Sequence, residues 1–338
     1  MKLVHKVLTK LPPEEAHNIG LTLLRLLPYK LDMDGESLHV ETRFGRLKNP
    51  VGLAAGFDKS GLHVKHLAKL GFGYMVVGTV TKNPRRGLAK PRVVRRREEQ
   101  GLVNAMAFPN PGLEQFIRNM SKAGDVGVPV LVSVSDVDEQ NLVECYIKVQ
   151  PLASGVEVNI SSPNTPQLKH YFQKETFTQV AESLRQHKRK PTYLKIPPYA
   201  NTDEKRIIDS VVKIWHDIGF EGVTAVNALL VDEPRVTAKM GGLSGKPLYP
   251  FMLKSVENIR RMYDMSFEVH AVGGISTGRQ VYETLVHGAN TVQLHTALAY
   301  RGASAVKEML EELLDVLESE NIGSLKDLQS MFRRAAEH

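Results

Sequence analysis

Cysteine and long apolar runs are scarce in this chain of 338 residues, and each scarcity excludes a class of protein. Cys145 is the one cysteine, so an intramolecular disulfide is excluded and a thiolate metal cluster is not expected, which fits a reducing compartment. No stretch reaches the roughly 18 apolar residues that a membrane-spanning helix needs. Lys2, Lys6 and Lys10 interrupt the apolar segment that a cleavable signal peptide requires. With 42% hydrophobic and 24% charged residues, a wholly disordered chain is excluded as well.

Short β-branched runs alternate with amphipathic stretches from residue 51 onward, and several runs are apolar throughout, as parallel strands buried on both faces are. The predicted strands are Val51–Phe57, Tyr74–Thr81, Val128–Ser135, Val156–Ser162, Thr192–Pro197, Gly222–Asn227, Glu268–Gly273 and Thr291–Thr296. The predicted helices are Ser60–Leu70, Leu113–Ala123, Phe177–Gln186, Glu204–Ile218, Leu248–Met262, Arg279–His287 and Ala303–Leu317. Eight strands of this spacing predict an α/β fold, a (β/α)8 TIM barrel; a doubly wound sheet is the alternative.

The remaining segments divide the chain into an N-terminal helical extension (1–36), the barrel (37–320) and a C-terminal helical tail (321–338). Within the barrel, residues 37–50 predict a hairpin that closes the bottom. Residues 1–30 predict two short amphipathic helices with a net charge of +3. One apolar stripe comprises Leu3, Val4, Val7, Leu8 and Leu11, and the other Ile19, Leu23, Leu26 and Leu27. Two interpretations stay open: these stripes dock the helices on the barrel, or they lie in an anionic membrane surface.

Lys and Arg outnumber Asp and Glu by 44 to 37, and the resulting charge of +7 suggests an anionic partner. Eight cations stand between residues 82 and 97 without an acid: Lys82, Arg85, Arg86, Lys90, Arg92, Arg95, Arg96 and Arg97. Nucleic-acid binding is one interpretation, but aromatic residues are not interleaved and Glu98 and Glu99 follow at once. We therefore predict a solvated or membrane-facing loop. His63 and His66, on a predicted helix, indicate a solvated helix face rather than a metal site.

Neutral hydrogen-bonding side chains are dense after the fourth predicted strand, in Asn159–Pro166 (NISSPNTP). Asn104 and Asn227 lie at or beyond the ends of other strands, Lys59 lies just after the first predicted strand, and Lys195 lies within the fifth. Because strand ends meet at the barrel mouth, these amides and lysines predict a pocket for a planar, polar, anionic heterocycle. The turns Val272–Ile275 and His295–Ala297 follow the last two strands, where barrels commonly bind phosphate through backbone N–H groups.

Five ordered motifs give the chain a family resemblance: Ala54–Lys59, Gly78–Thr81, Asn159–Pro166, Gly241–Gly245 and Val272–Ile275. They resemble dihydroorotate dehydrogenase, and specifically class 2, the membrane-associated, quinone-using branch. The resemblance covers nearly the whole chain, from residue 13 to about residue 315. Class 2 uses a serine base where class 1 uses cysteine, and Ser162 occupies that position here.

The resemblance implies oxidation of dihydroorotate to orotate by bound FMN, with a quinone as the electron acceptor. It assigns Ser162, Thr165 and Phe108 to catalysis, Lys59, Asn104, Asn159, Asn164 and Asn227 to the substrate, and Arg95 to the quinone. The implied cofactor residues are Ala55, Gly56, Thr79, Ser133, Asn159, Lys195, Gly245, Gly274, His295 and Thr296. It further implies a solvent-excluding lid at 167–174, peripheral contact of residues 1–30 with the cytoplasmic face of the cell membrane, a monomer, and neither a metal nor a nucleic-acid partner.

Several positions depart from the family pattern, mainly where the flavin is expected. Ala105 and Ala107 replace the usual Arg and Gly, Ser133 replaces an amide, Val226 and Ala228 replace hydroxyl residues, and His295 replaces a tyrosine. We therefore predict weaker flavin binding or a shifted redox potential before any loss of dihydroorotate recognition. Two alternatives remain: a flavin-dependent paralogue that oxidises another small heterocycle, and a non-catalytic barrel that binds an anionic ligand or nucleic acid.

Overall fold

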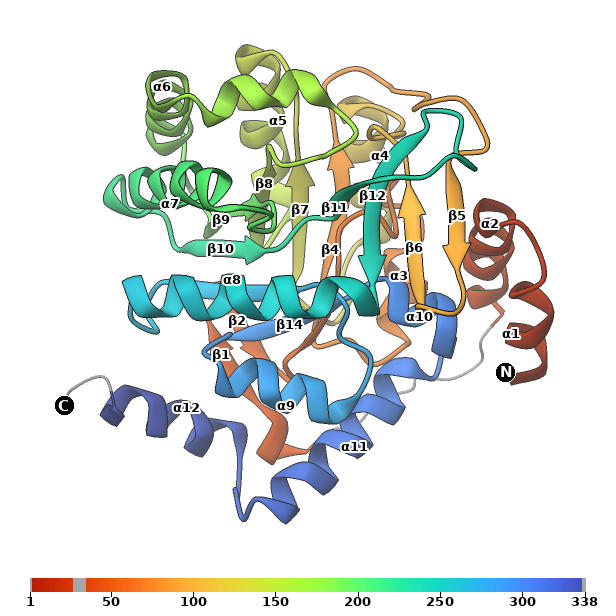
Figure 1. Ribbon diagram of the computed structural model, residues 1–338, viewed down its shortest axis with the longest axis vertical. Helices are drawn as coiled ribbons and strands as arrows, with labels where there is room; N and C mark the ends of the chain where they lie inside the picture. The colour runs from red at the N-terminus through yellow and green to blue at the C-terminus, as the bar shows by residue number, and fades with distance from the viewer. Residues whose placement is uncertain (1, 27–34, 336–338) are drawn as a thin grey trace.

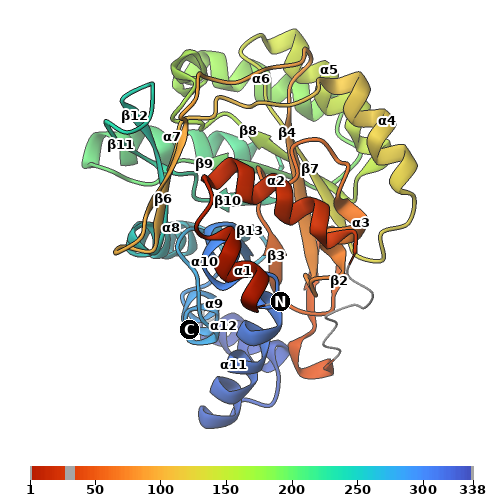
Figure 2. The ribbon, with the colours of Figure 1, turned by 90° about the vertical axis from the view of Figure 1, so that its right-hand side faces the viewer.

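A closed barrel of eight parallel strands forms the centre of the computed structural model, which describes residues 2–26 and 35–335 (Figures 1 and 2). Around the barrel the strands follow the order β10-β13-β14-β3-β4-β7-β8-β9. Their bounds are β3 (Val51–Leu53), β4 (Tyr74–Val80), β7 (Val130–Val134), β8 (Gly155–Asn159), β9 (Thr192–Ile196), β10 (Gly222–Ala225), β13 (Glu268–Val272) and β14 (Thr291–Leu294). The predicted (β/α)8 barrel is confirmed. The doubly wound alternative is wrong, because the sheet closes on itself.

Helices surround the barrel, and all but α10, which lies at its mouth, cover the outside and bury the outward side chains of the strands (Figure 1). They are α3 (Val64–Ala68), α4 (Leu113–Ala123), α5 (Glu139–Val149), α6 (Lys174–Gln186), α7 (Thr202–Asp217), α8 (Tyr249–Met262), α9 (Gly278–Val286), α10 (Thr296–Arg301) and α11 (Ala305–Ser319). Single-turn 3₁₀ segments are η1 (Glu36–Leu38), η2 (Gln150–Leu152) and η4 (Lys246–Leu248), and η3 (Pro166–Phe172) is longer. Asp138, Asn201 and Thr277 cap α5, α7 and α9 by accepting a hydrogen bond from the backbone N–H of the third residue of each helix.

The helix predicted for Ser60–Leu70 is shorter than expected, because a buried carboxylate fixes its first residues as a loop. Asp58 accepts hydrogen bonds from the backbone N–H groups of Ser60, Gly61 and His63, so α3 begins only at Val64. The face predicted to be solvated is only partly so, since His63 and His66 are half-buried and their Nδ1 atoms are buried.

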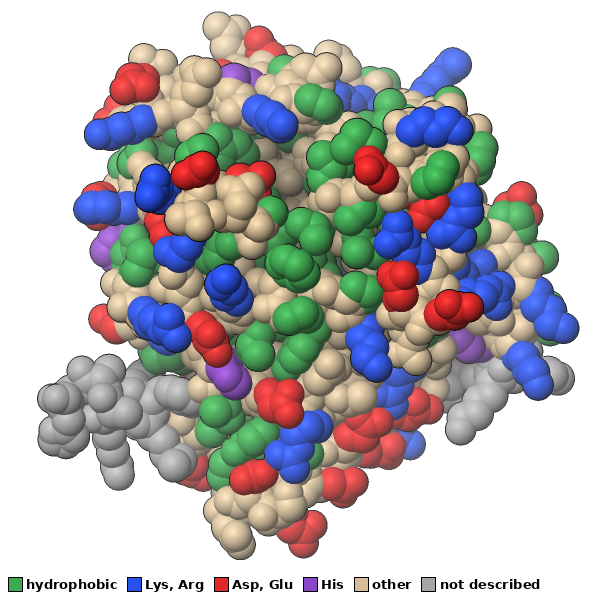
Figure 3. All heavy atoms as spheres, viewed as in Figure 1, with side chains coloured by type: hydrophobic (Ala, Val, Ile, Leu, Met, Phe, Trp, Pro, Cys, Tyr) green, Lys and Arg blue, Asp and Glu red, His purple; other side chains and the backbone are tan. Residues whose placement is uncertain are grey.

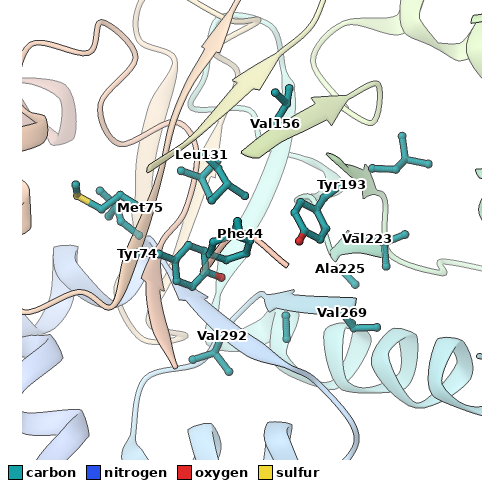
Figure 4. Packing of buried hydrophobic residues seen from close by; sticks show 14 of the residues in the cluster. Phe44, Tyr74, Met75, Leu131, Val156, Tyr193, Val223, Ala225, Val269 and Val292 are labelled. Carbon is teal, nitrogen blue, oxygen red and sulfur yellow. The ribbon is translucent and has the colours of Figure 1, made fainter. Parts of the chain in front are cut away.

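The predicted hairpin at the bottom of the barrel consists of β1 (Val40–Thr42) and β2 (Gly45–Leu47), which pair antiparallel. Its turn inserts Phe44 into the barrel, where the ring packs against Tyr74, His270 and Tyr193 with centroid separations of 5.2, 5.3 and 5.8 Å (Figure 4). Aromatic pairs at such distances add to the stability gained from burial. The hairpin therefore closes the floor of the barrel with an aromatic plug.

A second, four-stranded antiparallel sheet stands beside the barrel in the order β11-β12-β6-β5. Its strands are β5 (Val93–Arg96), β6 (Gly101–Asn104), β11 (Leu229–Asp232) and β12 (Met240–Gly245). The solvated or membrane-facing loop predicted for residues 82–97 is therefore wrong in its second half. Arg96 in β5 donates to Glu233, just past β11, at 3.0 Å. The basic run is thus partly used to hold this sheet together.

The N-terminal helices, α1 (Lys2–Leu8) and α2 (Pro13–Leu24), lie against β5 and α10 (Figures 1 and 2). Arg92 forms an ion pair with Glu14 at 2.9 Å, and Arg95 and Arg97 donate to the backbone oxygens of Leu11 and Thr9. These carbonyls follow the end of α1, where a cation is favourable.

The docked face of α2 is not the predicted stripe. Ala16, Leu21 and Leu24 are buried, whereas the predicted stripe residues Ile19 and Leu23 are exposed, as is Leu26 just beyond the helix. Leu27 and Lys30 of the predicted extension lie outside the described residues, as do the side chains of Lys2, Leu3 and Val4.

Helix α12 (Leu325–Ala335) ends the described part of the chain and packs Leu325 and Leu328 into the core near η1. Residues 336–338 of the predicted tail lie outside the described residues. Within residues 2–26 and 35–335, no helix combines the length and the apolar character needed to cross a bilayer. The same residues contain no group of three His, Cys, Asp or Glu side chains that could hold a metal ion.

Candidate active site

A cavity of about 1330 Å³ occupies the mouth of the barrel and continues beneath α1 and α2. It collects side chains from the ends of most barrel strands, from β6 and β12, and from both N-terminal helices. Of the residues predicted for the site, those that line it are Ala55, Gly56, Lys59, Thr79, Arg95, Asn104, Phe108, Asn159, Ser162, Asn164, Lys195, Asn227, Gly245, Gly274, His295 and Thr296. Ser133 and Thr165 are buried next to these residues but do not line the cavity.

The four predicted substrate amides form two hydrogen-bonded pairs. Asn227 Nδ2 donates to Asn159 Oδ1 at 3.2 Å and to Ser161 Oγ at 3.0 Å. Asn164 Nδ2 donates to Asn104 Oδ1 at 3.2 Å. Each pair joins segments more than 55 residues apart in sequence, so the barrel topology brings them together. Because an amide both donates and accepts, these pairs can exchange partners with a polar ligand ring.

Lys59 places a cation at the same mouth, in the loop between β3 and α3. Its Nζ donates to the Gly56 carbonyl oxygen at 2.5 Å, and the neighbouring Asp58 holds the loop as described above. Burial lowers the pKa of Lys59 to about 8, although Glu14 and Asp58 act in the opposite direction. The amine of Lys59 is therefore mostly charged at neutral pH, and an anionic ligand bound beside it would raise its pKa.

Ser162 and Phe108 line the cavity, and the hydroxyl of Thr165 is buried close by in sequence. Thr165 Oγ1 has no hydrogen-bond partner in the protein, which is unusual for a buried hydroxyl. Phe108 has a positive φ of 58°, and the preceding Ala107 one of 52°. Positive φ is uncommon for these residue types and costs free energy. This strained turn aims the Met106–Phe108 loop into the cavity.

The predicted cofactor residues form a polar cofactor wall that adjoins the amides. Asn159 Nδ2 donates to Thr79 Oγ1 at 3.2 Å, and Thr79 Oγ1 lies 2.9 Å from Ser133 Oγ. Ser133 is thus engaged with Thr79 below the cavity. Thr296 Oγ1 lies 2.9 Å from Ser244 Oγ, at the start of α10. Gly274 has φ +77°, and a Cβ there would lie 2.6 Å from the Tyr249 backbone nitrogen, so only glycine fits this close approach.

An aromatic path joins α2 to the barrel mouth, and the sequence did not indicate it. The His17 ring meets Phe57 edge-on at 4.7 Å, and Phe57 meets His295 at 5.5 Å. Burial and the charges of nearby lysines lower the pKa of His17 to about 3 and that of His295 to about 4. Both rings are therefore neutral at pH 7. Arg95 lines the same part of the cavity, and its Nε atom is buried without a partner.

Gln293 is a second residue that sequence reasoning missed. It is 1% exposed and lines the cavity, and neither its amide oxygen nor its amide nitrogen has a hydrogen-bond partner. Its place within an apolar strand pattern gave no signal of this role. An unpaired amide at the base of a cavity is a ready contact for a polar ligand.

Comparison with known proteins places the chain in a family. The model of the family described as dihydroorotate dehydrogenase matches residues 37–317. A dihydroorotate dehydrogenase (quinone) of Psychrobacter sp. is 31% identical, covering 92% of this chain and 96% of the relative. One from Coxiella burnetii is 34% identical, covering 90% and 94%. The crystal structure of DHODH in complex with ferulenol from Eimeria tenella superposes with a TM-score of 0.85 and 27% identity, covering 94% of each chain. The chain belongs to the dihydroorotate dehydrogenase family.

Proposed function

We propose that this protein oxidises (S)-dihydroorotate to orotate with FMN as cofactor and a quinone as electron acceptor, the fourth step of de novo pyrimidine synthesis. The observation that carries the proposal is the convergence of Ser162, Lys59 and the two amide pairs on one cavity at the barrel mouth. A hydroxyl, a cation and four amides suit a flat ring that bears a carboxylate. The relatives described as dihydroorotate dehydrogenase (quinone) support the same substrate and acceptor.

The cofactor wall fits FMN in its polar groups. Gln293 offers an unpaired buried amide, Lys195 a buried ammonium, and the Gly274 turn a backbone that no side chain obstructs. Thr79, Gly245, His295 and Thr296, with Ala55 and Gly56, would complete the site. FMN, when bound, supplies a two-electron acceptor for the hydride on C6 of dihydroorotate.

The chain's own residues would carry the proton chemistry. Lys59 would neutralise the substrate carboxylate, and Asn104, Asn159, Asn164 and Asn227 would hold the ring. Ser162 would take the C5 proton as C6 loses its hydride, so that dihydroorotate leaves as orotate. A serine hydroxyl is a weak base in water, and the step therefore needs a dry pocket and a proton exit. The unpaired hydroxyl of Thr165 supports an exit beside Phe108, and residues 167–174, which include most of η3 (Pro166–Phe172), would act as the lid.

The quinone would reach the flavin through the part of the cavity beneath α1 and α2, past Arg95. His17 and Phe57 would line this passage, because their rings connect α2 with His295. The exposed apolar side chains Val7, Ile19, Leu23 and Leu26 support peripheral membrane contact. Lys and Arg side chains gather on the same edge of the molecule, over β5 and the N-terminal helices (Figure 3). Together these features suit the cytoplasmic face of an anionic membrane. We further propose that the protein is a monomer.

A flavin-dependent paralogue acting on another heterocycle is the second candidate, and the altered flavin-side residues favour it. Val226 and Ala228 cannot donate hydrogen bonds from their side chains, and Ser133 bonds to Thr79. Each lost hydrogen bond weakens binding by about 0.5–1.5 kcal/mol. A non-catalytic barrel is less well supported, because a binding module has no use for Ser162 beside a hydride acceptor.

One anaerobic experiment tests the proposal. The protein is purified with added FMN, freed of excess flavin, and mixed with dihydroorotate while the oxidised flavin absorption is followed. We expect bound flavin that bleaches on mixing. Retained flavin that bleaches only with another ring would favour the paralogue, and a protein that retains no flavin would favour the non-catalytic barrel.

A further inference from the structure

Glu157 is an acidic residue inside the barrel, where branched apolar side chains usually pack. It lies in β8, its side chain is completely buried, and neither carboxylate oxygen has a hydrogen-bond partner. The cation that compensates it is Lys195, whose Nζ lies 3.5 Å from Glu157 Oε1. A buried carboxylate without hydrogen bonds is tolerated only beside such a charge.

The strand register puts this pair directly under the cofactor wall. β8 and β9 are parallel neighbours, and Lys195 is opposite Asn159, whereas Glu157 is opposite Tyr193, two residues closer to the floor. Lys195 lines the cavity and Glu157 does not. The ammonium therefore has the cavity on one side and the carboxylate on the other.

The other buried glutamate of the described barrel strands, Glu268, has hydrogen-bond donors of its own. Glu268 lies at the floor, where Tyr193 Oη and the Arg43 backbone N–H donate to its two oxygens. Lys195 also acts on His295, whose pKa it helps to lower, so its charge is felt across the barrel mouth. Two charges 3.5 Å apart in a buried site, as in the Lys195–Glu157 pair, interact strongly.

We propose that Glu157 is a positioning residue, which fixes the Lys195 ammonium and offsets its charge, so that the pair rather than the lysine alone sets the reduction potential of the bound flavin. This inference depends on the proposed function. Negative charge grows on the N1/O2 edge of a flavin as it is reduced, and a lone buried cation favours that charge. The Glu157 carboxylate beneath Lys195 offsets part of this positive charge, so the pair favours flavin reduction less than a lone lysine would.

The test is the midpoint potential of the FMN-loaded protein, measured anaerobically by reductive titration against a reference dye. Glu157→Gln keeps the side-chain shape and removes the charge. We expect the equilibrium constant for two-electron reduction to rise at least tenfold, which is about 30 mV. Lys195→Met should lower this equilibrium constant. In the double variant the constant should return to within about threefold of the wild-type value, because removing both charges restores the net charge. Glu268→Gln is the matched control at the floor, and its equilibrium constant for reduction should stay within about threefold of the wild-type value.

Unchanged or lowered potential in Glu157→Gln, with a clear change in Lys195→Met, would overturn the proposal and leave Glu157 a packing residue. A second measurement, thermal unfolding of the flavin-free protein, stays informative if a variant binds FMN poorly. Lys195→Met should unfold at a lower temperature than the double variant, because it leaves Glu157 buried without its cation. A double variant no more stable than Lys195→Met would also contradict the pairing. Failure of the wild type to bind FMN would contradict the proposed function, and the unfolding comparison would then decide the charge pairing alone.

Discussion

At the floor of the barrel the buried polar side chains bond to one another, whereas at the mouth several of them have no partner in the protein. Tyr74 Oη and His270 Nδ1 both contact Thr291 Oγ1, at 2.6 and 2.7 Å, and Tyr193 donates to Glu268. The His270 Nε2 atom, 3.7 Å from Glu268, is the exception at the floor.

At the mouth, by contrast, the hydroxyl of Thr165 and the amide of Gln293 are buried and unpaired. A closed hydrogen-bond network stabilises the fold, while unpaired buried groups cost stability unless a ligand satisfies them. The difference indicates that buried polar residues at the floor stabilise the fold, whereas those at the mouth bind ligands. TIM barrels generally have their active site at the mouth and residues important for stability at the floor.

Glu268 provides the largest predicted difference between the floor and the mouth of the barrel, because its substitution should change stability but not activity. Burial raises its pKa to about 7 from an ordinary 4.5, so the native protein keeps a proton that the unfolded chain releases. Stability present below pH 4.5 is therefore lost as the pH rises to 7, by about 3 kcal/mol. Urea unfolding from pH 4.5 to 7.5 should show this fall in the wild type and not in Glu268→Gln.

Burial lowers the pKa of His270 to about 3, so the titration of His270 changes the free energy of unfolding with pH in the opposite direction to that of Glu268. Flavin reduction by dihydroorotate should be the same in the wild type and in Glu268→Gln. Parallel stability curves, or a loss of activity in Glu268→Gln, would contradict the assignment of this residue to the floor.

Asn227 provides the reverse test at the mouth. Asn227→Ala removes donors to Asn159 and Ser161 and a predicted ligand contact, so orotate affinity should fall about 10–100-fold. The free energy of unfolding should change by less than about 1 kcal/mol, because the side chain is only partly buried. Tyr193→Phe at the floor is the control, and it should lose about 1–3 kcal/mol of stability without a change in orotate affinity. If the two variants changed orotate affinity equally, the distinction between binding residues at the mouth and stabilising residues at the floor would be wrong.

Lys59 makes binding at the mouth depend on pH. Because burial lowers its pKa to about 8, the free protein loses this cation as the pH rises above 8, and orotate affinity should then fall about tenfold per pH unit. Isothermal titration between pH 7 and 9.5 measures the slope. Lys59→Met should bind weakly at every pH, and a wild-type profile as flat as the variant's would argue against the carboxylate contact.

The loop that carries Phe108 offers a smaller effect. Ala107 has φ +52°, a conformation that costs a non-glycine residue about 1 kcal/mol. Ala107→Gly should therefore raise the free energy of unfolding by up to about that amount, whereas Ala105→Gly, at a buried position without positive φ, should lower it. Denaturant midpoints of the two variants moving in the same direction would contradict this account of the strain.

The barrel could be predicted because its strands are buried on both faces, so they contain continuous apolar runs such as Tyr74–Val77. The four-stranded sheet could not. β6 pairs with β12, about 140 residues away, and neither the basic β5 nor the glycine-rich β12 shows an apolar alternation. Local sequence does not encode such a distant pairing.

The candidate site was largely predictable for a topological reason: polar residues that follow parallel strands meet at the barrel mouth. Two residues within strands were missed. Glu157 and Gln293 point into the barrel from otherwise apolar runs, and only the three-dimensional register shows what they face. The docked face of α2 was also predicted incorrectly, since the exposed and buried leucines of α2 cannot be told apart by spacing alone.

The most direct test of the account is the rate of flavin bleaching when FMN-loaded protein meets dihydroorotate in an anaerobic stopped-flow instrument. The wild type should bleach, and Ser162→Ala should bleach about 10²–10⁴-fold more slowly while binding FMN and orotate with unchanged affinity. Bleaching at the wild-type rate in Ser162→Ala would contradict the placement of the base, and with it the chemistry assigned to the mouth of the barrel.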